Sequence, residues 1–231
     1  MFKIPVHAFP DEEREAARQL QMSVAAVEMQ CSSFQAALSL YDYCSVHVTT
    51  ALERGDFETR RLLGSWQHIA MRDGAMTIYH FWHALQGANG AIAKCPTLSP
   101  LVRRDSLGTA FDVYRAAFPR SEAVRHGVSH SAEMTKNQKK FTKHVAEGPW
   151  NAPGIDISEG VEIFFGGSSA DRQFIINFEG AIVSYELSST TMATLNKCYA
   201  LLCESLNAAC EELRRRAFEE REEGPQRHGI D

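Results

Sequence analysis

The sequence lacks most of the features that place a chain in a functional class at first sight. It has no apolar run of 18 residues, which excludes a conventional transmembrane helix, and its first residues lack the apolar stretch of a secretory signal. Its six cysteines include no Cys-x-x-Cys pair, which argues against a cysteine zinc site. It has no glycine-rich phosphate loop, dinucleotide fingerprint or Gly-x-Ser-x-Gly elbow, so those nucleotide-binding and hydrolase chemistries have no support. We therefore expect a cytoplasmic protein with no membrane segment and no cofactor.

Charge is distributed unevenly along the chain. The 231 residues are 44% hydrophobic, enough for one sizeable core, and carry a net charge of −5. Residues 103–143 nevertheless hold nine Lys and Arg and four acids, a local balance of +5, so the rest of the chain sums to −10. A basic stretch in an acidic protein predicts an anion-binding surface. The basic residues are Arg103, Arg104, Arg115, Arg120, Arg125, Lys136, Lys139, Lys140 and Lys143.

The spacing of apolar residues predicts a mainly α protein. Apolar side chains recur at three- and four-residue steps from Leu20 to Leu52, which predicts a helix from Asp11 to about Arg54, broken near 44–50 where β-branched residues cluster. Further helices are expected over 56–86, ending in the glycines of 87–90, over 99–118, over 120–133, and from Ser188 or Ser189 to about 222. Three glycines within these helices, Gly64, Gly74 and Gly108, are interpreted as sites of close helix–helix approach.

A change of period predicts a small antiparallel sheet before the last helix. Segments 161–165, 173–178 and 181–187 are β-branched and aromatic, and turn-forming residues separate them. We expect a three-stranded meander at about 160–188, preceded by a mobile basic loop over 134–157.

The fold class is therefore mainly α, a helical bundle with an inserted β-meander, or α+β by strict count. We expect one domain over 1–223 and a disordered tail over 224–231.

The residues that carry chemistry concentrate between Arg125 and His130. Arginine grips phosphate in a bidentate fork, and histidine moves protons near neutral pH. Arg125, His126 and His130 together could cleave a phosphodiester without a metal. Two other interpretations stay open. His126 and His130 are four residues apart and Glu122 extends their face, which is also the spacing of a metal-ligand row, and a helix-surface cluster with no function is the third interpretation.

The same residues resemble the signature of HEPN domains, all-helical modules of which many are metal-independent ribonucleases. In that signature a polar residue directly follows the arginine of Arg-x4-His, and His126 matches it. The resemblance covers the motif and its helical setting, and it departs from the minimal domain in Gly127 and in the meander. It implies an RNA-directed protein in which His130 takes the proton of a ribose 2′-OH, Arg125 stabilises the phosphate and His126 orients the site or binds the phosphate. It also implies a homodimer with two facing motif helices.

A row of polar side chains on the second predicted helix is a second candidate for the site. His68, Arg72, Tyr79 and His83 are 4, 7 and 4 residues apart and share one face. We expect either a buried polar row or a contribution of Arg72 and His68 to substrate binding. Arg120, Lys139 and Lys140 are further candidates for substrate binding.

The alternative function is a helical binding module without catalysis, whose ligand could be a protein partner. The net negative charge favours this alternative, because general RNA binders are more often basic.

Overall fold

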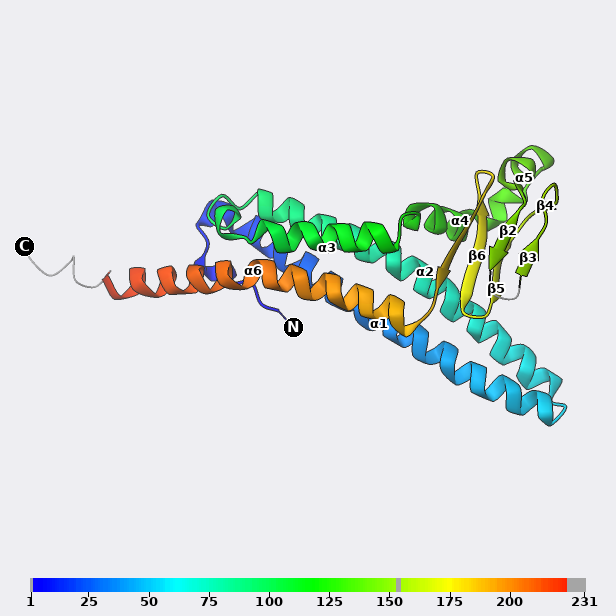
Figure 1. Ribbon diagram of the computed structural model, residues 1–231. Helices are drawn as coiled ribbons and strands as arrows, with labels where there is room; N and C mark the ends of the chain where they lie inside the picture. The colour runs from blue at the N-terminus through cyan, green and yellow to red at the C-terminus, as the bar shows by residue number, and fades with distance from the viewer. Residues whose placement is uncertain (1, 153–154, 224–231) are drawn as a thin grey trace, which may run out of the picture. The chain divides into compact units, whose positions relative to one another are not determined.

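The computed structural model of the chain describes residues 2–152 and 155–223, with the side chains of 130–132, 152, 168–170 and 220–223 excepted. It is 71% helical, with short antiparallel strands before the last helix, which confirms the predicted fold class. No helix among these residues is long and apolar enough to cross a membrane. The helices are α1 (Arg14–Glu53), α2 (Phe57–Ala93), α3 (Arg104–Ala117), α4 (Ser121–Met134), α5 (Gln138–His144) and α6 (Ser189–Glu223) (Figure 1).

The chain forms two compact units, whose boundaries fall within α1, α2 and α6 and at the last residue of α3. Within the described residues, the first unit holds 2–29, 81–116 and 194–223, and the second holds 30–80 and 117–193. The expectation of a single domain over 1–223 stays a prediction. The tail predicted over 224–231 lies outside the described residues.

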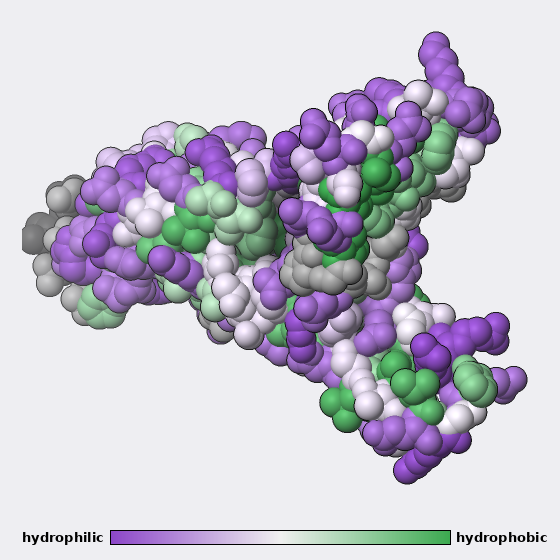
Figure 2. Space-filling model, turned by 45° about the vertical axis from the view of Figure 1, so that its right-hand side comes forward, coloured by the Kyte–Doolittle hydropathy of each residue, from purple (hydrophilic) through white to green (hydrophobic). Residues whose placement is uncertain are grey.

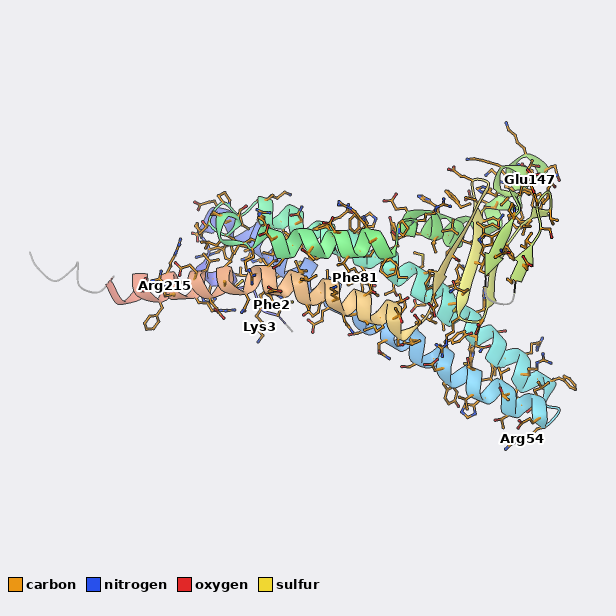
Figure 3. All side chains as sticks on the ribbon, in the orientation of Figure 1. Phe2, Lys3, Arg54, Phe81, Glu147 and Arg215 are labelled. Atoms are coloured by element: carbon orange, nitrogen blue, oxygen red, sulfur yellow. The ribbon has the colours of Figure 1, made fainter. Side chains whose placement is uncertain are left out.

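The first unit is a helical bundle with an aromatic core. Phe81, labelled in Figure 3, is fully buried and stacks in parallel on Tyr114 with ring centroids 5.9 Å apart. Trp82 stacks on the same tyrosine at 4.8 Å. Gly87 lets α1 approach α2, because a Cβ there would lie 3.1 Å from the Ser23 hydroxyl oxygen. The predicted end of the second helix at 87–90 was therefore wrong: Gly87 serves packing, Gly90 meets nothing within 4 Å, and α2 continues to Ala93.

The second unit is built on an antiparallel hairpin of α1 and α2, which run side by side and meet in a tight turn (Figure 1). Arg54, labelled in Figure 3, marks this end, and Gly55 supplies the positive φ of +69° that ends α1 as predicted. The break predicted near 44–50 was wrong. Hydroxyls in that stretch donate to carbonyls one turn back, as Ser45 does to Tyr41, so the β-branched residues are accommodated in a continuous helix.

The sheet of the second unit has the strand order β5-β6-β7, with β5 at Gly166–Ala170, β6 at Gln173–Phe178 and β7 at Ala181–Glu186. Both hairpin turns have two residues with positive φ, Asp171–Arg172 and Glu179–Gly180, as the type I′ turn requires. Of the three predicted strands, the last two are confirmed.

The first strand of the predicted meander was placed too early in the sequence. Residues 161–165 form no strand of the meander. Buried Asn177 of β6 binds this segment through its backbone N–H, which donates to the Phe165 carbonyl at 3.0 Å, and through its side chain. Its carbonyl accepts from the Phe165 amide at 2.8 Å, and its amide donates to the Ile163 carbonyl at 2.9 Å. The residues expected to form the turn, 166–170, form β5 instead.

The predicted loop at 134–157 also contains regular structure. Asn137 caps α5, and β1 (Ala146–Glu147) pairs with β4 (Glu162–Ile163). The other short pair is β2 (Trp150–Ala152) with β3 (Ile155–Ile157). Lysine-rich α5 was missed because three lysines in seven residues leave too few apolar side chains for a recognisable period.

Glycines in the helices have two different roles. A Cβ at Gly74 would lie 2.7 Å from the Tyr185 hydroxyl and 2.9 Å from Leu187 Cδ1, so this glycine admits the sheet rather than another helix. Tyr185 is buried there and donates to the Met71 carbonyl, and burial raises its pKa. Gly64 and Gly108 meet nothing within 4 Å, so their interpretation as packing sites was wrong.

Candidate functional site

Helix α4 is held against the sheet by a close backbone approach. It begins at Ser121 and ends at Met134, which confirms the predicted motif helix. A Cβ at Gly127 would lie 2.8 to 3.1 Å from three carbons of Ile176 on β6, and the neighbouring Val124 and Val128 are buried. The glycine inside the motif is therefore required by packing. This packing leaves Arg125 half-buried and His126 exposed.

Arg125 is held by an aromatic ring rather than by an acid. Its guanidinium lies over the Tyr79 ring, 5.5 Å from the centroid, and its Nη1 is 3.2 Å from Nδ1 of His126. Its Nε is buried and has no hydrogen-bond partner among the described residues. An arginine so placed keeps donor capacity for a ligand, because no carboxylate among those residues forms an ion pair with it.

The His126 ring is held between two partners. It stacks on Phe178 with centroids 5.5 Å apart and an interplanar angle of 16°. Arginine has only donors, so Nδ1 of neutral His126 accepts from Arg125 and the ring proton sits on Nε2. In this arrangement His126 offers a hydrogen-bond donor to a ligand and not a base, which agrees with an orienting or phosphate-binding role.

A second histidine reaches the same phenylalanine from α5. The His144 ring lies 5.5 Å from the Phe178 centroid, and its Nδ1 accepts from the Glu179 amide at 3.0 Å. Burial, and then the neighbouring Lys143, lower the pKa of His144. The Glu179 carboxylate accepts from Lys143 Nζ at 2.9 Å, and that hydrogen bond lowers the pKa of Glu179. No local pattern points to these contacts, because His144 and Phe178 are 34 positions apart.

The polar row on α2 divides between separate surroundings. His68 and Arg72 line a cavity of about 30 Å³ closed by Val128 and the sheet, which holds about one water molecule. Burial, and then the charge of Arg72, lower the pKa of His68. Tyr79 lies under Arg125 instead. His83, the fourth member of the predicted row, belongs to the first unit.

The other predicted substrate-binding residues lie on exposed positions of the second unit. Arg120 precedes α4 and makes no side-chain capping bond. Lys139 is exposed on α5, and Lys140 lies 3.8 Å from Glu133. The side chain of His130 lies outside those that the structure describes, although its backbone is part of α4. Within the described part of the chain, no three His, Cys, Asp or Glu residues are arranged to hold a metal ion.

Comparisons with known proteins found no relative: no family model matches the sequence, and no curated protein or solved structure is significantly similar to it. Any function must therefore be argued from the residues themselves.

Proposed function

We propose that this is an RNA-directed protein in which Arg125 and His126 bind a phosphodiester, and that it cleaves RNA without a metal. The observation that carries the proposal is the Arg125–His126 contact of 3.2 Å, in which the guanidinium rests on an aromatic ring and not on a carboxylate. A phosphate oxygen is the partner that best satisfies a half-buried arginine with unused donors.

In the proposed reaction a base removes the proton of the ribose 2′-OH. The 2′-oxygen then attacks the phosphorus, and the bond to the 5′-oxygen breaks. Arg125 stabilises the negative charge that builds on the phosphate, and the Nε2 proton of His126 donates to the same oxygens. The base is His130, assigned from the sequence resemblance alone, and its imidazole could take the proton near neutral pH.

Two more observations support a ligand that carries phosphate. Lys136 and Lys139 are exposed and form no ion pair with any described residue, so the end of α4 and α5 add positive charge beside the motif helix. Aromatic rings also lie in the cluster, with Tyr79 beneath Arg125 and Phe178 beneath His126. Both kinds of group are common where proteins hold single-stranded RNA.

The test is incubation of the full chain with mixed RNA in EDTA, beside Arg125→Ala, Arg125→Lys, His126→Ala and His130→Ala. Arg18→Ala is the charge-matched control, since Arg18 is exposed in the first unit and, among the described residues, forms an ion pair only with Glu15. We expect wild type and the control to cleave, and Arg125→Ala and His130→Ala to lose at least about 100-fold in rate. Arg125→Lys should lose nearly as much, because lysine keeps the charge and loses the fork. Equal cleavage by wild type and His130→Ala would remove the enzymatic claim.

One observation favours the non-catalytic alternative, a binding module. The His126 Nδ1 lone pair is already used by Arg125, so the described pair binds a ligand and does not abstract a proton.

A salt titration of RNA binding separates the catalytic and the non-catalytic function. Phosphate contacts predict an affinity that falls steeply with salt. For a single strand, the logarithm of the binding constant falls by about 0.7 per contacted phosphate for each tenfold rise in salt concentration. RNA binding that depends on Arg125 without cleavage identifies the module, and no RNA binding at low salt points to a protein partner.

The homodimer implied by the resemblance is also a proposal. Arg125 and His126 meet within one chain, so a second chain is not needed to bring this pair together. The surface that a second chain would occupy is a separate question.

A further inference from the structure

The α1–α2 hairpin of the second unit exposes large hydrophobic side chains. Eight of the twelve that are exposed among the described residues lie between residues 40 and 69. Figure 2 shows hydrophobic residues gathered on the hairpin, at the lower right. Five of them form what we call the apolar hairpin face: Leu40 (37% exposed), Tyr43 (55%), Leu62 (50%), Trp66 (39%) and Ile69 (57%).

The five side chains share one side of the hairpin. At about 100° per residue, Trp66 is about 160° around α2 from His68, which contacts Phe174 of the sheet. Tyr43 is likewise about 160° around α1 from Tyr41, whose ring contacts Arg172. The apolar hairpin face therefore points away from the sheet. On α1 the exposed residue follows the buried contact by two positions, and on α2 it precedes that contact by two. Because the two helices are antiparallel, these opposite offsets rotate both stripes in the same direction, so both lie on one side of the hairpin.

The two stripes follow the spacing of helices that pack on other helices. On α1 the steps are 3, 4, 3, 4 and 3 through Ser33, Ala36, Leu40, Tyr43, His47 and Thr50, and on α2 they are 3, 4, 3 and 4 through Thr59, Leu62, Trp66, Ile69 and Asp73. Helices that pack on other helices carry apolar side chains at this spacing, and the middle of the two stripes supplies them at Ala36, Leu40, Tyr43, Leu62, Trp66 and Ile69. The hydrogen bond from Gln67 to Ser45 fixes the register of the hairpin, so that Tyr43 lies level with Ile69. Two apolar stripes that run side by side in this register are best covered by another pair of helices.

The face is almost without charge. Residues 30–52 contain a single Asp, Glu, Lys or Arg, which is Asp42, and its carboxylate is bound by Arg172 at 2.5 Å. On the α2 stripe only Asp73 is charged, and it lies at the end of the stripe. An exposed helix normally carries charge on its solvent side. A neutral face can meet a copy of itself without burying like charges.

We infer that a second copy of this chain packs on the apolar hairpin face, so that two hairpins form an antiparallel four-helix arrangement about a two-fold axis. The 18 residues from 33 to 50 span about 27 Å, and two helices are about 20 Å wide, which gives about 540 Å² per chain. The pair would bury about 1,100 Å², just above the roughly 1,000 Å² expected of a specific interface. A two-fold axis would let each chain cover the apolar hairpin face of the other.

This inference does not rest on the phosphate site. The site residues lie on α4, packed on the sheet, whereas the apolar hairpin face points away from the sheet. The dimer surface inferred here also differs from the facing motif helices that the HEPN resemblance implies.

The experiment is sedimentation equilibrium of the full chain from 1 to 200 µM. Wild type should shift from 25.8 kDa towards twice that mass as concentration rises. Ile69→Glu should remain at 25.8 kDa throughout, a loss of at least 50-fold in association. Phe218→Glu is the matched control, because Phe218 is 61% exposed and belongs to the first unit, and it should associate as wild type does. Circular dichroism verifies the fold, and Leu62→Glu replaces Ile69→Glu if that variant does not fold.

Several outcomes would overturn the inference. Wild type that stays monomeric to 200 µM shows that the face serves another partner or none. A dimer that survives both Ile69→Glu and Leu62→Glu uses a different surface. Dissociation by Arg125→Ala but not by Ile69→Glu would place the interface on the motif helix instead. Loss of RNA cleavage with association intact affects only the proposed function.

Discussion

The two units differ in how their charged side chains are held, because the first pairs them with protein donors and acids, whereas Arg125 of the second rests on an aromatic ring. In the first unit the buried carboxylate of Glu13 accepts from the amide and the hydroxyl of Thr97, at 3.1 and 2.6 Å, and Arg103 pairs with Glu204 at 2.8 Å. In the second unit Arg125 rests on an aromatic ring with a buried Nε that lacks a hydrogen-bond partner. Of the candidate site residues, all but His83 lie in this second unit.

The two units also differ in how far they bury apolar surface. In the first unit Phe81 and Tyr114 are almost completely buried in a stacked pair, whereas the hairpin of the second unit exposes Tyr43, Trp66 and Ile69. The difference follows from geometry, because a pair of helices has only one contact face for each member. The hairpin of the second unit therefore has a surface that a partner can complete.

The largest stability effect is expected from breaking a polar contact of the first unit. Glu13→Ala leaves the Thr97 amide and hydroxyl without their acceptor, and hydrogen bonds to a charged group are worth about 1.5–3 kcal/mol. We expect the free energy of unfolding to fall by about 2–3 kcal/mol in urea titrations. RNA affinity should stay unchanged, because the residue is structural.

The control is Glu12→Ala, the exposed neighbour, which should change the free energy of unfolding by less than about 0.5 kcal/mol. A large loss of RNA affinity in folded Glu13→Ala would contradict the division of roles between the units.

Glycine-to-alanine substitutions should change the free energy of unfolding by a smaller amount, with destabilisation in the second unit and stabilisation in the first. Gly127→Ala would force the new methyl into Ile176 and cost about 1–3 kcal/mol by overpacking. Gly108→Ala on α3 meets nothing and should stabilise by up to about 1 kcal/mol through helix propensity. Thermal unfolding of both variants measures the difference. Ile176→Val removes the Cδ1 atom nearest to the clash, so the double variant should recover part of the loss. Equal destabilisation at both glycines would show that α4 is not packed as described.

The smallest effect is expected from pH. His144 has its pKa lowered by burial, so the unfolded chain binds the proton more readily than the folded chain. Stability from this group is complete above the ordinary histidine pKa of about 6.5 and is lost as pH falls through the lower folded value. The melting temperature should fall by up to about 3 °C between pH 7.5 and 5.5, and less in His144→Gln, whose amide oxygen can still accept from Glu179. His68 shifts in the same direction and leaves a residual slope. A steeper pH dependence in His144→Gln would refute the lowered pKa.

Local patterns accounted for most of the helices but not for the contents of the site. Periodicity was sufficient for α4, because the proline at 119 separates it from α3 and its apolar positions recur at helical steps. It failed for β5, where the Gly-Gly-Ser-Ser-Ala sequence has the composition of a turn and becomes a strand only because β6 offers partners. It failed again for α5, because three of its seven residues are lysines and the buried residue, His144, is not apolar.

The sequence by itself determined most of the long helices, the turn at 179–180, the local excess of positive charge and the presence of an arginine beside a histidine, because each depends on residues that are close along the chain. Only the tertiary structure decided that Tyr79 supports Arg125, that Phe178 joins His126 to His144, and that one side of the hairpin is left uncovered. These contacts join residues tens of positions apart. Their geometry is set by how closely α4 approaches the sheet at Gly127, which no local pattern encodes.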